Sequence, residues 1–472
     1  MFSNELWQKS GVSTYSIDQS IRFNAGDSTY MQRTHGAGGN TDAWTVSLWT
    51  KKGDHPPSAP QIVFASGSSS SSTFDLYFEN NIADQLAIQD YSGAYNVFLK
   101  TTQLFRDPSA WYHIVYVYDS GNAVSTERAR LYVNGVRVTD FTTATYPAQN
   151  TDSIVGTNVN IGFGKLAYSA SNYYNGYLAE MHYVNGSALD PSSFGEYNSS
   201  NIWIPKEYSG SYGTGGFYIK GEDSSDLGND SSGNGNDLTT SGLGAHDQVL
   251  DSPTNNFPTL NPISSDGLAS GELTGGNLEM RNITEITASM PFPTSGKWYW
   301  ELCTVSKTQS NWNYGAHYFK DVADRLAYSS FTDYIYTNFY HGSNFGSSSN
   351  WTDGDFWSNS NAAAAGDVFG FAWDSDNKKI WLAKNNTYYG SGDPSGNSGT
   401  PLGSGGTAGV EYVVSMYSTL SQVMTLNFGQ DDTFNNAKTS GSAGAADGNG
   451  VGKFYYAPPT GFLALCTKNK GS

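Results

Sequence analysis

Short segments in which apolar and polar residues alternate recur along the whole chain, and turn-forming residues bound each of them. In WYHIVYVYD, Ile114, Tyr116 and Tyr118 would lie on one face and the two intervening valines on the other. This period of two is typical of a β-strand, whose successive side chains point to opposite faces. Because stretches of helical periodicity are nearly absent, the pattern predicts an all-β protein.

Five strand-like segments occur between residues 20 and 200. They are Ser20–Phe23 (SIRF), Trp44–Thr50 (WTVSLWT), Trp111–Asp119, Leu131–Val138 (LYVNGVRV) and Asn175–Val184 (NGYLAEMHYV). In the fourth, Asn134 and Gly135 supply the two positive φ angles of a type I′ turn, which predicts a tight hairpin. Taken in order, the five resemble the laminin-G-like, concanavalin A-like jelly roll. That resemblance implies an antiparallel β-sandwich over residues 20–200.

A second set of strand-like segments follows in the C-terminal half. It consists of 296–301 (GKWYWE), 366–374 (GDVFGFAWD), 379–385 (KIWLAKN), 426–430 (LNFGQ) and 456–462 (YAPPTGF). Their order resembles the SPRY family, a β-sandwich that binds partners through its loops. We therefore expect two antiparallel β-sandwich (jelly-roll) domains, with the SPRY-like one over residues 263–472.

Two further segments complete the predicted organisation. Residues 1–19 are polar and aperiodic, and could be a solvated tail or an arm docked on another subunit. Residues 201–262 are rich in Asp, Asn and Gly, and then in Pro, which indicates an extended connector packed on one or both domains. The whole arrangement resembles virion proteins of tailed bacteriophages, especially marine ones.

Composition and charge narrow the functional classes. The length of 472 residues suits two sandwich domains, and only 14% of the residues are charged. A formal net charge of −18 argues against nucleic-acid binding and against anionic membrane surfaces, since both require clustered Lys and Arg. No apolar run approaches the ~20 residues of a membrane span, and the first residues do not resemble a secretory signal. We expect a virion protein made in the host cytoplasm, without membrane insertion.

The two cysteines, Cys303 and Cys466, lie in apolar strand-like runs at opposite ends of the C-terminal domain. We expect buried free thiols, although a disulfide between the first and last strands is an alternative. Two cysteines form neither a disulfide scaffold nor a zinc site.

Catalytic motifs are not visible. Retaining glycosidases of the concanavalin-like fold use a Glu-x-Asp-x-(x)-Glu strand, but Glu180 is followed by Met-His-Tyr and Glu301 by Leu-Cys-Thr. Carboxylates converging from separate loops are the alternative. We expect a binding protein that is not an enzyme and needs no cofactor.

One loop carries oxygen ligands at close spacing, which makes a weak Ca²⁺ candidate of Asp230, Asn234, Asn236 and Asp237. The same residue types also form turns by bonding their own backbone, and that interpretation needs no ion.

Surface aromatic residues are the remaining candidates for a binding site. Residues 334–357 crowd eight aromatic residues among Asn, Asp and Ser, which suits the apolar face and the hydroxyls of a sugar ring. The alternative is that about half of them fill the core. The candidate ligand-binding residues are Tyr336, Tyr340, Trp351 and Trp357, with a second patch at Tyr173 and Tyr174 beside Tyr168.

The resemblance to virion proteins implies a tail fibre or tail-associated adhesin that recognises a host-surface glycan or protein. The alternative is a head fibre or capsid decoration protein with mainly structural contacts. Other virion proteins are the expected partners, and the symmetry of phage particles suggests a homotrimer.

Overall fold

The computed structural model describes residues 15–53, 59–80, 84–264, 273–281, 286–306, 312–317, 334–338, 364–398, 403–404, 413–418, 423–440 and 445–470. Within these residues the secondary structure consists of β-strands and six 3-10 turns, so the expected all-β class is confirmed. The turns are η2 (Ala25–Asp27), η4 (Ser125–Glu127), η5 (Pro191–Ser193), η6 (Ala245–Asp247), η7 (Pro262–Ser264) and η9 (Tyr389–Ser391). No helix in these ranges is both long and apolar enough to cross a membrane.

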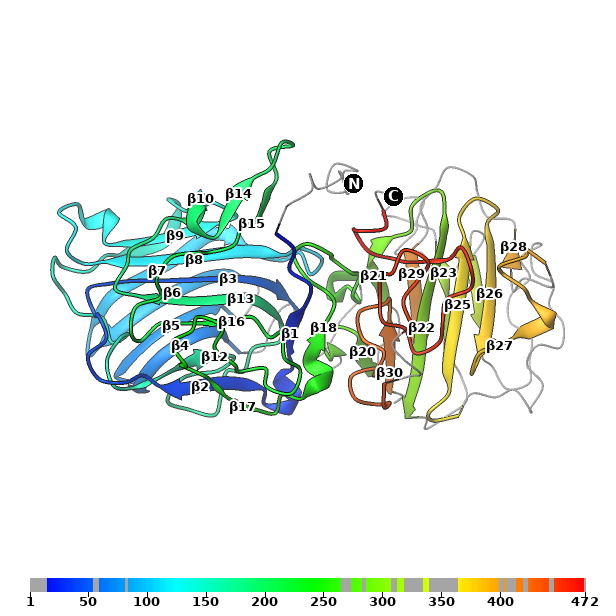
Figure 1. Ribbon diagram of the computed structural model, residues 1–472, viewed down its shortest axis with the longest axis horizontal. Helices are drawn as coiled ribbons and strands as arrows, with labels where there is room; N and C mark the ends of the chain where they lie inside the picture. The colour runs from blue at the N-terminus through cyan, green and yellow to red at the C-terminus, as the bar shows by residue number, and fades with distance from the viewer. Residues whose placement is uncertain are drawn as a thin grey trace. The chain divides into compact units, whose positions relative to one another are not determined.

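The chain divides into two compact units (Figure 1). The first contains the described residues of 9–255 together with 274–276, and the second contains those of 256–273 and 277–472.

The first unit is a sandwich of two eight-stranded sheets. The first sheet has the order β10 (Val136–Arg137), β9 (Ala129–Val133), β8 (Tyr112–Asp119), β3 (Ala43–Lys52), β13 (Gly176–Asn185), β1 (Ser20–Phe23) and β18 (Gln248–Val249), with β16 (Phe217–Ile219) also paired to β13. The second has the order β11 (Phe141–Thr145), β7 (Tyr95–Leu104), β6 (Gln85–Ser92), β5 (Ser72–Phe78), β4 (Gln61–Ser69), β12 (Asn160–Phe163), β2 (Tyr30–Thr34) and β17 (Thr239–Ser241). A separate hairpin joins β14 (Gly195–Tyr197) to β15 (Trp203–Pro205).

Aromatic side chains from both sheets fill the core of this unit. Trp44 of β3 packs edge-on against Phe74 of β5, with ring centroids 5.0 Å apart, and lies 5.3 Å from Tyr116 of β8. All three are fully buried. The predicted hairpin is also confirmed, because Asn134 and Gly135 have φ angles of 49° and 77° and connect β9 to β10.

The first sheet is buried on both faces. As the alternation predicts, Ile114, Tyr116 and Tyr118 lie in the main core. The opposite face of β8 carries Val115 and Val117, which belong to a second apolar cluster formed with residues from the segment after β13. Because apolar residues cover both faces of β8, this strand is stabilised more than a strand with one face in solvent would be.

An ion pair helps to close this outer face. Lys51 Nζ of β3 lies 2.7 Å from Asp251 Oδ2, and neither side chain is exposed. The other Asp251 oxygen accepts a hydrogen bond of 3.1 Å from the Trp111 indole. Burial lowers the pKa of Lys51, and the carboxylate of Asp251 opposes that effect. The segment around residue 251 is therefore held on the sheet by a paired buried charge.

Residues 201–262, predicted to be a connector, supply strands to both sheets of the first unit. β16 pairs with β13, β17 pairs with β2 and β18 pairs with β1. The side chains of Phe217 and Ile219 lie in the main core. The structure thus places most of this segment inside the first unit, because strands of two or three residues bury side chains without leaving a readable periodicity.

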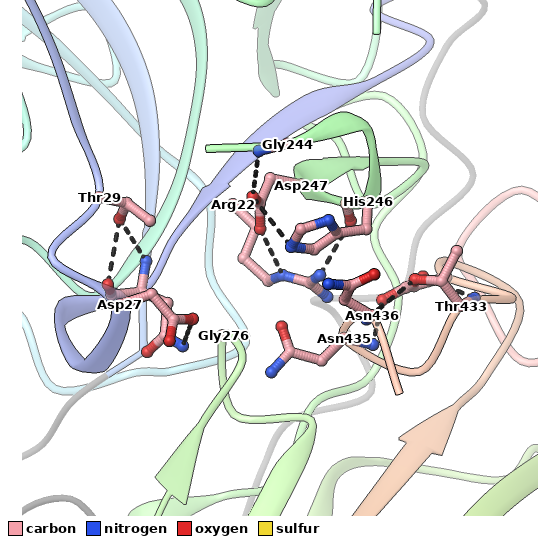
Figure 2. A network of polar contacts seen from close by, with 12 residues as sticks. Arg22, Asp27, Thr29, Gly244, His246, Asp247, Gly276, Thr433, Asn435 and Asn436 are labelled. Atoms are coloured by element: carbon pink, nitrogen blue, oxygen red, sulfur yellow. Dashed lines mark hydrogen bonds and ion pairs between the residues drawn. The ribbon is translucent and has the colours of Figure 1, made fainter. Parts of the chain in front are cut away.

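A second buried ion pair fixes η6 to β1 (Figure 2). The Arg22 Nε atom lies 3.5 Å from Asp247 Oδ1, and its Nη2 donates to the carbonyl oxygen of His246 at 2.8 Å. The other oxygen of Asp247 accepts the backbone N–H of Gly244. Arg22 is fully buried, so this contact is part of the fold and not of an exposed site.

The second unit contains a nine-stranded and a four-stranded sheet. The larger has the order β19 (Leu273–Thr274), β20 (Glu279–Arg281), β30 (Val423–Asn427), β22 (Lys297–Ser306), β25 (Val368–Asp374), β26 (Lys379–Lys384) and β27 (Thr387–Tyr388), with β28 (Gly403–Ser404) on β26 and β31 (Leu463–Ala464) parallel to β22. The smaller has the order β21 (Ile286–Pro291), β29 (Val413–Ser418), β23 (Trp312–His317) and β24 (Tyr334–Asn338). Trp300 of β22 stacks on Phe371 of β25 with ring centroids 5.0 Å apart.

Two predicted strands of this unit need correction. Residues 456–462 form turns and not a strand, since Pro458 and Pro459 lack the backbone N–H that a ladder requires. The segment 426–430 is a strand only as far as Asn427, whose side chain then accepts the backbone N–H groups of Gly429 and Asp431.

Both thiols of the second unit are free and buried, in line with the preferred prediction. Burial raises the pKa of Cys303 to about 11, and that of Cys466 to about 12. Thiols of this kind pack as small apolar groups.

Candidate functional site

Aromatic and polar side chains lie together on the outer face of the second sheet, which points away from the main core. Alternation along β5 places Phe74 and Leu76 in the main core, so Asp75 and Tyr77 point outward. We call this surface the tyrosine face. It is made of Tyr30, Tyr77, Tyr91, Tyr95, Phe98, Tyr168 and Tyr173.

The most exposed part of the tyrosine face lies on β6 and β7. Tyr95 is 47% exposed, which is unusual for a large aromatic side chain on a strand. It stacks on Phe98 with ring centroids 4.7 Å apart and planes 12° from parallel, and it meets Tyr91 edge-on at 5.0 Å. These three rings form an aromatic stack at the solvent boundary. Such a surface offers contact area at little cost in side-chain entropy.

A buried carboxylate lies beside this stack. Asp75 is fully buried, and its Oδ2 accepts a hydrogen bond of 2.7 Å from Gln89 Nε2. The hydroxyl of Thr73 lies 3.1 Å and 3.2 Å from its two oxygens. Burial raises the pKa of Asp75 to about 6, although these hydrogen bonds favour the ionised form. Gln89 in turn lies opposite Phe98 in the sheet register.

An ion pair borders the same region. Lys100 Nζ of β7 lies 2.5 Å from Glu79 Oε1 and 5.7 Å from the centre of the Phe98 ring. Burial and the nearby carboxylate of Glu79 raise the pKa of Tyr77. The cation on this side is thus matched by a carboxylate.

The far end of the tyrosine face lies on β2 and the loop after β12. Tyr30 and Tyr173 have ring centroids 6.5 Å apart. Lys165 Nζ lies 4.4 Å from the centre of the Tyr30 ring and donates to Gln32 Oε1 at 2.8 Å. Burial lowers the pKa of Lys165. At this end of the tyrosine face, an aromatic ring and an amide group thus lie on either side of one lysine.

The residues predicted from sequence fall in different places. Tyr173 belongs to the tyrosine face, whereas Tyr174 is fully buried and its hydroxyl lies 2.5 Å from Thr50 Oγ1. Tyr174 is therefore a core residue, and its selection as a ligand contact does not fit the structure. The backbone of Tyr336 lies in β24 opposite Gly315. Tyr340, Trp351 and Trp357 lie outside the described residues, so their role stays a prediction.

The aromatic stack was missed because residues 85–104 were not read as strands. In QLAIQDYSGAYNVFLK, the large aliphatic residues Leu86, Ile88, Val97 and Leu99 alternate with small, polar or aromatic residues. The intervening Ser-Gly turn would have joined two strands and placed their aromatic residues on one outer face. This alternation and this turn are the sequence features that predict the aromatic stack.

The loop considered for Ca²⁺ uses its acidic oxygens internally. Asp230 Oδ1 accepts the backbone N–H groups of Tyr218 and Ser232, and its Oδ2 accepts the N–H of Asn236. The Asn234 side chain donates to the carbonyl oxygens of Gly213 and Gly216. These hydrogen bonds account for the Asp and Asn pattern as turn formation, and the described residues contain no group of three His, Cys, Asp or Glu side chains placed to hold a metal ion.

The buried carboxylates of the two domains also have fixed partners. Glu180 accepts the hydroxyls of Tyr15 at 2.6 Å and Tyr218 at 2.7 Å. Glu301 accepts the backbone N–H groups of Tyr455 and Tyr456, and burial raises its pKa to about 7. Both carboxylates hold distant segments together within their own unit.

Comparisons with known proteins agree with this fold. Residues 25–193 match the family described as the Concanavalin A-like lectin/glucanases superfamily. No curated protein matches the chain.

Three solved structures illustrate the similarity. Mouse laminin α1 chain domains LG4-5 share 10% identity, covering 89% of this chain and 92% of that one with a TM-score of 0.29. The SPRY domain of human HERC1 shares 12% identity, covering 35% and 96% with a TM-score of 0.23. The enzymatically active domain of bacteriophage CBA120 tailspike protein 2 shares 15%, covering 39% and 29% with a TM-score of 0.27. Similarities this distant do not extend to function.

The first unit therefore contains a laminin-G-like, concanavalin A-like β-sandwich, and the described residues of both units form all-β structures whose strands pair antiparallel except for β31 with β22. A SPRY domain is among the structures similar to it.

Proposed function

We propose that this chain is a structural protein of a tailed bacteriophage virion, a tail fibre or tail-associated adhesin that recognises a host-surface glycan. The aromatic stack of Tyr91, Tyr95 and Phe98 beside Gln89 carries the proposal. An exposed aromatic ring matches the C–H face of a sugar, and an amide matches its hydroxyl groups. The match of residues 25–193 to a family described as lectins and glucanases supports a carbohydrate ligand.

The proposed activity is binding without cleavage. Asp75, Glu180 and Glu301 are each buried and hydrogen-bonded within the fold, which supports roles other than acid–base catalysis for these carboxylates. A carboxylate pair that flanked a bound sugar would be needed for hydrolysis.

Binding of the intact chain to host cells and to a glycan array tests the proposal. We expect saturable binding to at least one immobilised glycan, with no reducing ends released during the incubation. If the chain bound neither a glycan on the array nor the host cells, the adhesin role would be rejected. Release of sugar would reject binding without catalysis.

A head fibre or decoration protein is the second candidate. Val136 is 61% exposed and Tyr197 is 48% exposed, and they lie on two hairpins joined by a contact of 3.5 Å between Tyr197 Oη and the Asn134 carbonyl. Exposed apolar residues on neighbouring hairpins favour contact with another virion protein. An image of the particle that locates the chain on the head would support this candidate, and one that locates it on the tail would support the adhesin.

A homotrimer assembled in the virion is part of the proposal. Sedimentation of the isolated chain distinguishes a stable trimer from a monomer that is organised only by its attachment site. Because Tyr197 is exposed on its hairpin, Tyr197→Ser is a suitable variant for testing whether that surface joins the subunits.

A further inference from the structure

Gln89 lies between a carboxylate and an aromatic ring on the tyrosine face. In the register of the second sheet, Gln89 of β6 pairs with Asp75 of β5 on one side and with Phe98 of β7 on the other. Its Nε2 donates to Asp75 Oδ2 at 2.7 Å. Gln89 is half-buried, so the rest of its amide is within reach of solvent.

The carboxylate determines which end of the amide faces the ligand. An ionised carboxylate has only acceptor atoms, so the Gln89 amide must direct its NH₂ group toward Asp75. Its carbonyl oxygen is then the end directed away from Asp75. Asp75 is itself fixed, because it is fully buried and both of its oxygens lie within hydrogen-bond distance of the Thr73 hydroxyl.

We propose that Asp75 is a positioning residue that makes Gln89 a hydrogen-bond acceptor for a ligand hydroxyl beside the Tyr95–Phe98 stack. This inference rests on the proposed glycan-binding function and adds the orientation of the polar contact. A sugar hydroxyl that donates to Gln89 Oε1 would be selected over a ligand atom that can only accept.

Protonation of Asp75 would reverse this arrangement. A neutral carboxyl group can donate its O–H to Gln89 Oε1, and the amide can then turn its NH₂ group toward the ligand. Burial, assisted by the nearby carboxylate of Asp90, raises the pKa of Asp75 to about 6. The other titratable groups of this region are Tyr77 and Tyr168, which interact electrostatically with Asp75, and the ion pair of Glu79 with Lys100.

Four forms of the full chain test the inference: wild type, Asp75→Asn, Gln89→Leu and the control Gln85→Leu. Gln85 is on the same strand, but its Nε2 donates to Thr101 O and Thr142 Oγ1 and to no carboxylate. The probe is the oligosaccharide with the strongest signal on an array of neutral and acidic glycans, and calorimetry measures its Kd at pH 8 and pH 5.

We expect the wild type and Gln85→Leu to bind about tenfold more weakly at pH 5 than at pH 8, because one hydrogen bond to the ligand is lost. Asp75→Asn should bind weakly and equally at both pH values, since its amide holds Gln89 in neither orientation. Gln89→Leu should also be weak and insensitive to pH. Retention of the wild-type pH dependence by Asp75→Asn would overturn the inference and leave glycan binding intact.

A ligand-free measurement separates this inference from the proposed function. In protein labelled with ¹⁵N-glutamine, the side-chain NH₂ resonances of Gln89 are identified by their loss in Gln89→Leu. They should titrate with a midpoint near pH 6 in the wild type and stay constant in Asp75→Asn. A Gln89 resonance that does not respond to pH in the wild type overturns the switch, whereas failure of every form to bind any glycan overturns the proposed function and the inference with it.

Discussion

The indole Nε1 of Trp203 donates a hydrogen bond of 3.0 Å to Nδ1 of His113. Because an indole N–H can only donate, Nδ1 carries the lone pair and Nε2 carries the proton. That proton is then donated to Ser47 Oγ at 2.9 Å. The two hydrogen bonds fix one neutral tautomer of a fully enclosed imidazole.

The stability of the first unit should fall below pH 6.5 because of His113. Burial lowers the pKa of His113 to about 3, so the unfolded chain takes up a proton that the folded chain excludes. The stabilising contribution is complete above the unfolded pKa of 6.5 and decreases as the pH falls, by about 1.4 kcal/mol per pH unit. Urea unfolding at pH 7, 6 and 5 should show this loss in the wild type and not in His113→Phe. Parallel pH profiles for the two forms would contradict it.

Asp90 should have the opposite pH dependence. It accepts the hydroxyl of Ser153 at 2.6 Å inside the sandwich, and burial raises its pKa to about 6. A raised folded pKa gives stability that is present below the unfolded pKa of 3.8 and is lost as the pH rises through about 6.

The variant Asp90→Asn isolates that contribution. The difference in unfolding free energy between Asp90→Asn and the wild type should shift in favour of the variant by about 3 kcal/mol from pH 4 to pH 7. A pKa shift of about two units corresponds to about that energy. Denaturant titrations of both forms at the two pH values measure the difference. An equal difference at pH 4 and pH 7 would show that Asp90 ionises at its ordinary pKa.

Truncation of the aromatic stack should affect binding more than stability. Tyr95→Ala and Phe98→Ala should each weaken glycan or host-cell binding about tenfold or more, because interface energy concentrates in exposed aromatic anchors. Tyr95→Ala should change the free energy of unfolding by only about 0.5 kcal/mol.

Two controls accompany this experiment. Leu104 lies on the same strand and is 41% exposed, so Leu104→Ala should alter neither binding nor stability appreciably. Tyr174→Ala, in the core, should cost roughly 3–5 kcal/mol of stability. Unchanged binding by both stack variants would place the ligand elsewhere, for instance on the predicted residues Trp351 and Trp357.

Removal of one partner from the Lys51–Asp251 pair should destabilise the first unit strongly. Lys51→Met leaves a buried carboxylate without its cation, which costs roughly 3–5 kcal/mol. The double variant Lys51→Met with Asp251→Asn should recover much of that loss, as measured by thermal unfolding. Lys220 and Glu222 form a matched exposed pair at 2.8 Å, so Lys220→Met should have little effect. A small effect of Lys51→Met would show that the segment around Asp251 is held by its other contacts.

The sequence predicts the fold well wherever one strand carries its own pattern. The ranges expected for Ser20–Phe23 and the Asn134–Gly135 turn agree with the structure, because alternation and positive φ are local properties. Strands β17 and β18 were missed, since each has only two or three residues and depends on a distant partner. Local propensity is too weak to define such strands.

The candidate site was harder to predict for a related reason. Tyr173 and Tyr174 are adjacent and chemically equal in the sequence, yet one lies on the tyrosine face and the other in the core. Their difference is set by the hydrogen bonds of Tyr174 to Thr50 and Lys51, more than a hundred residues away. Asp75 and Gln89 likewise come together only through the pairing of β5 with β6.

The position of β1 has a consequence for synthesis of the chain. This strand lies between β13 and β18, although it is made before both of them. During translation both hydrogen-bonding edges of SIRF stay unpaired until their partner strands emerge much later from the ribosome. Pairings over such long separations form slowly, and open edges can recruit neighbouring nascent chains. Chaperones that shield the growing polypeptide should therefore raise the yield of folded protein.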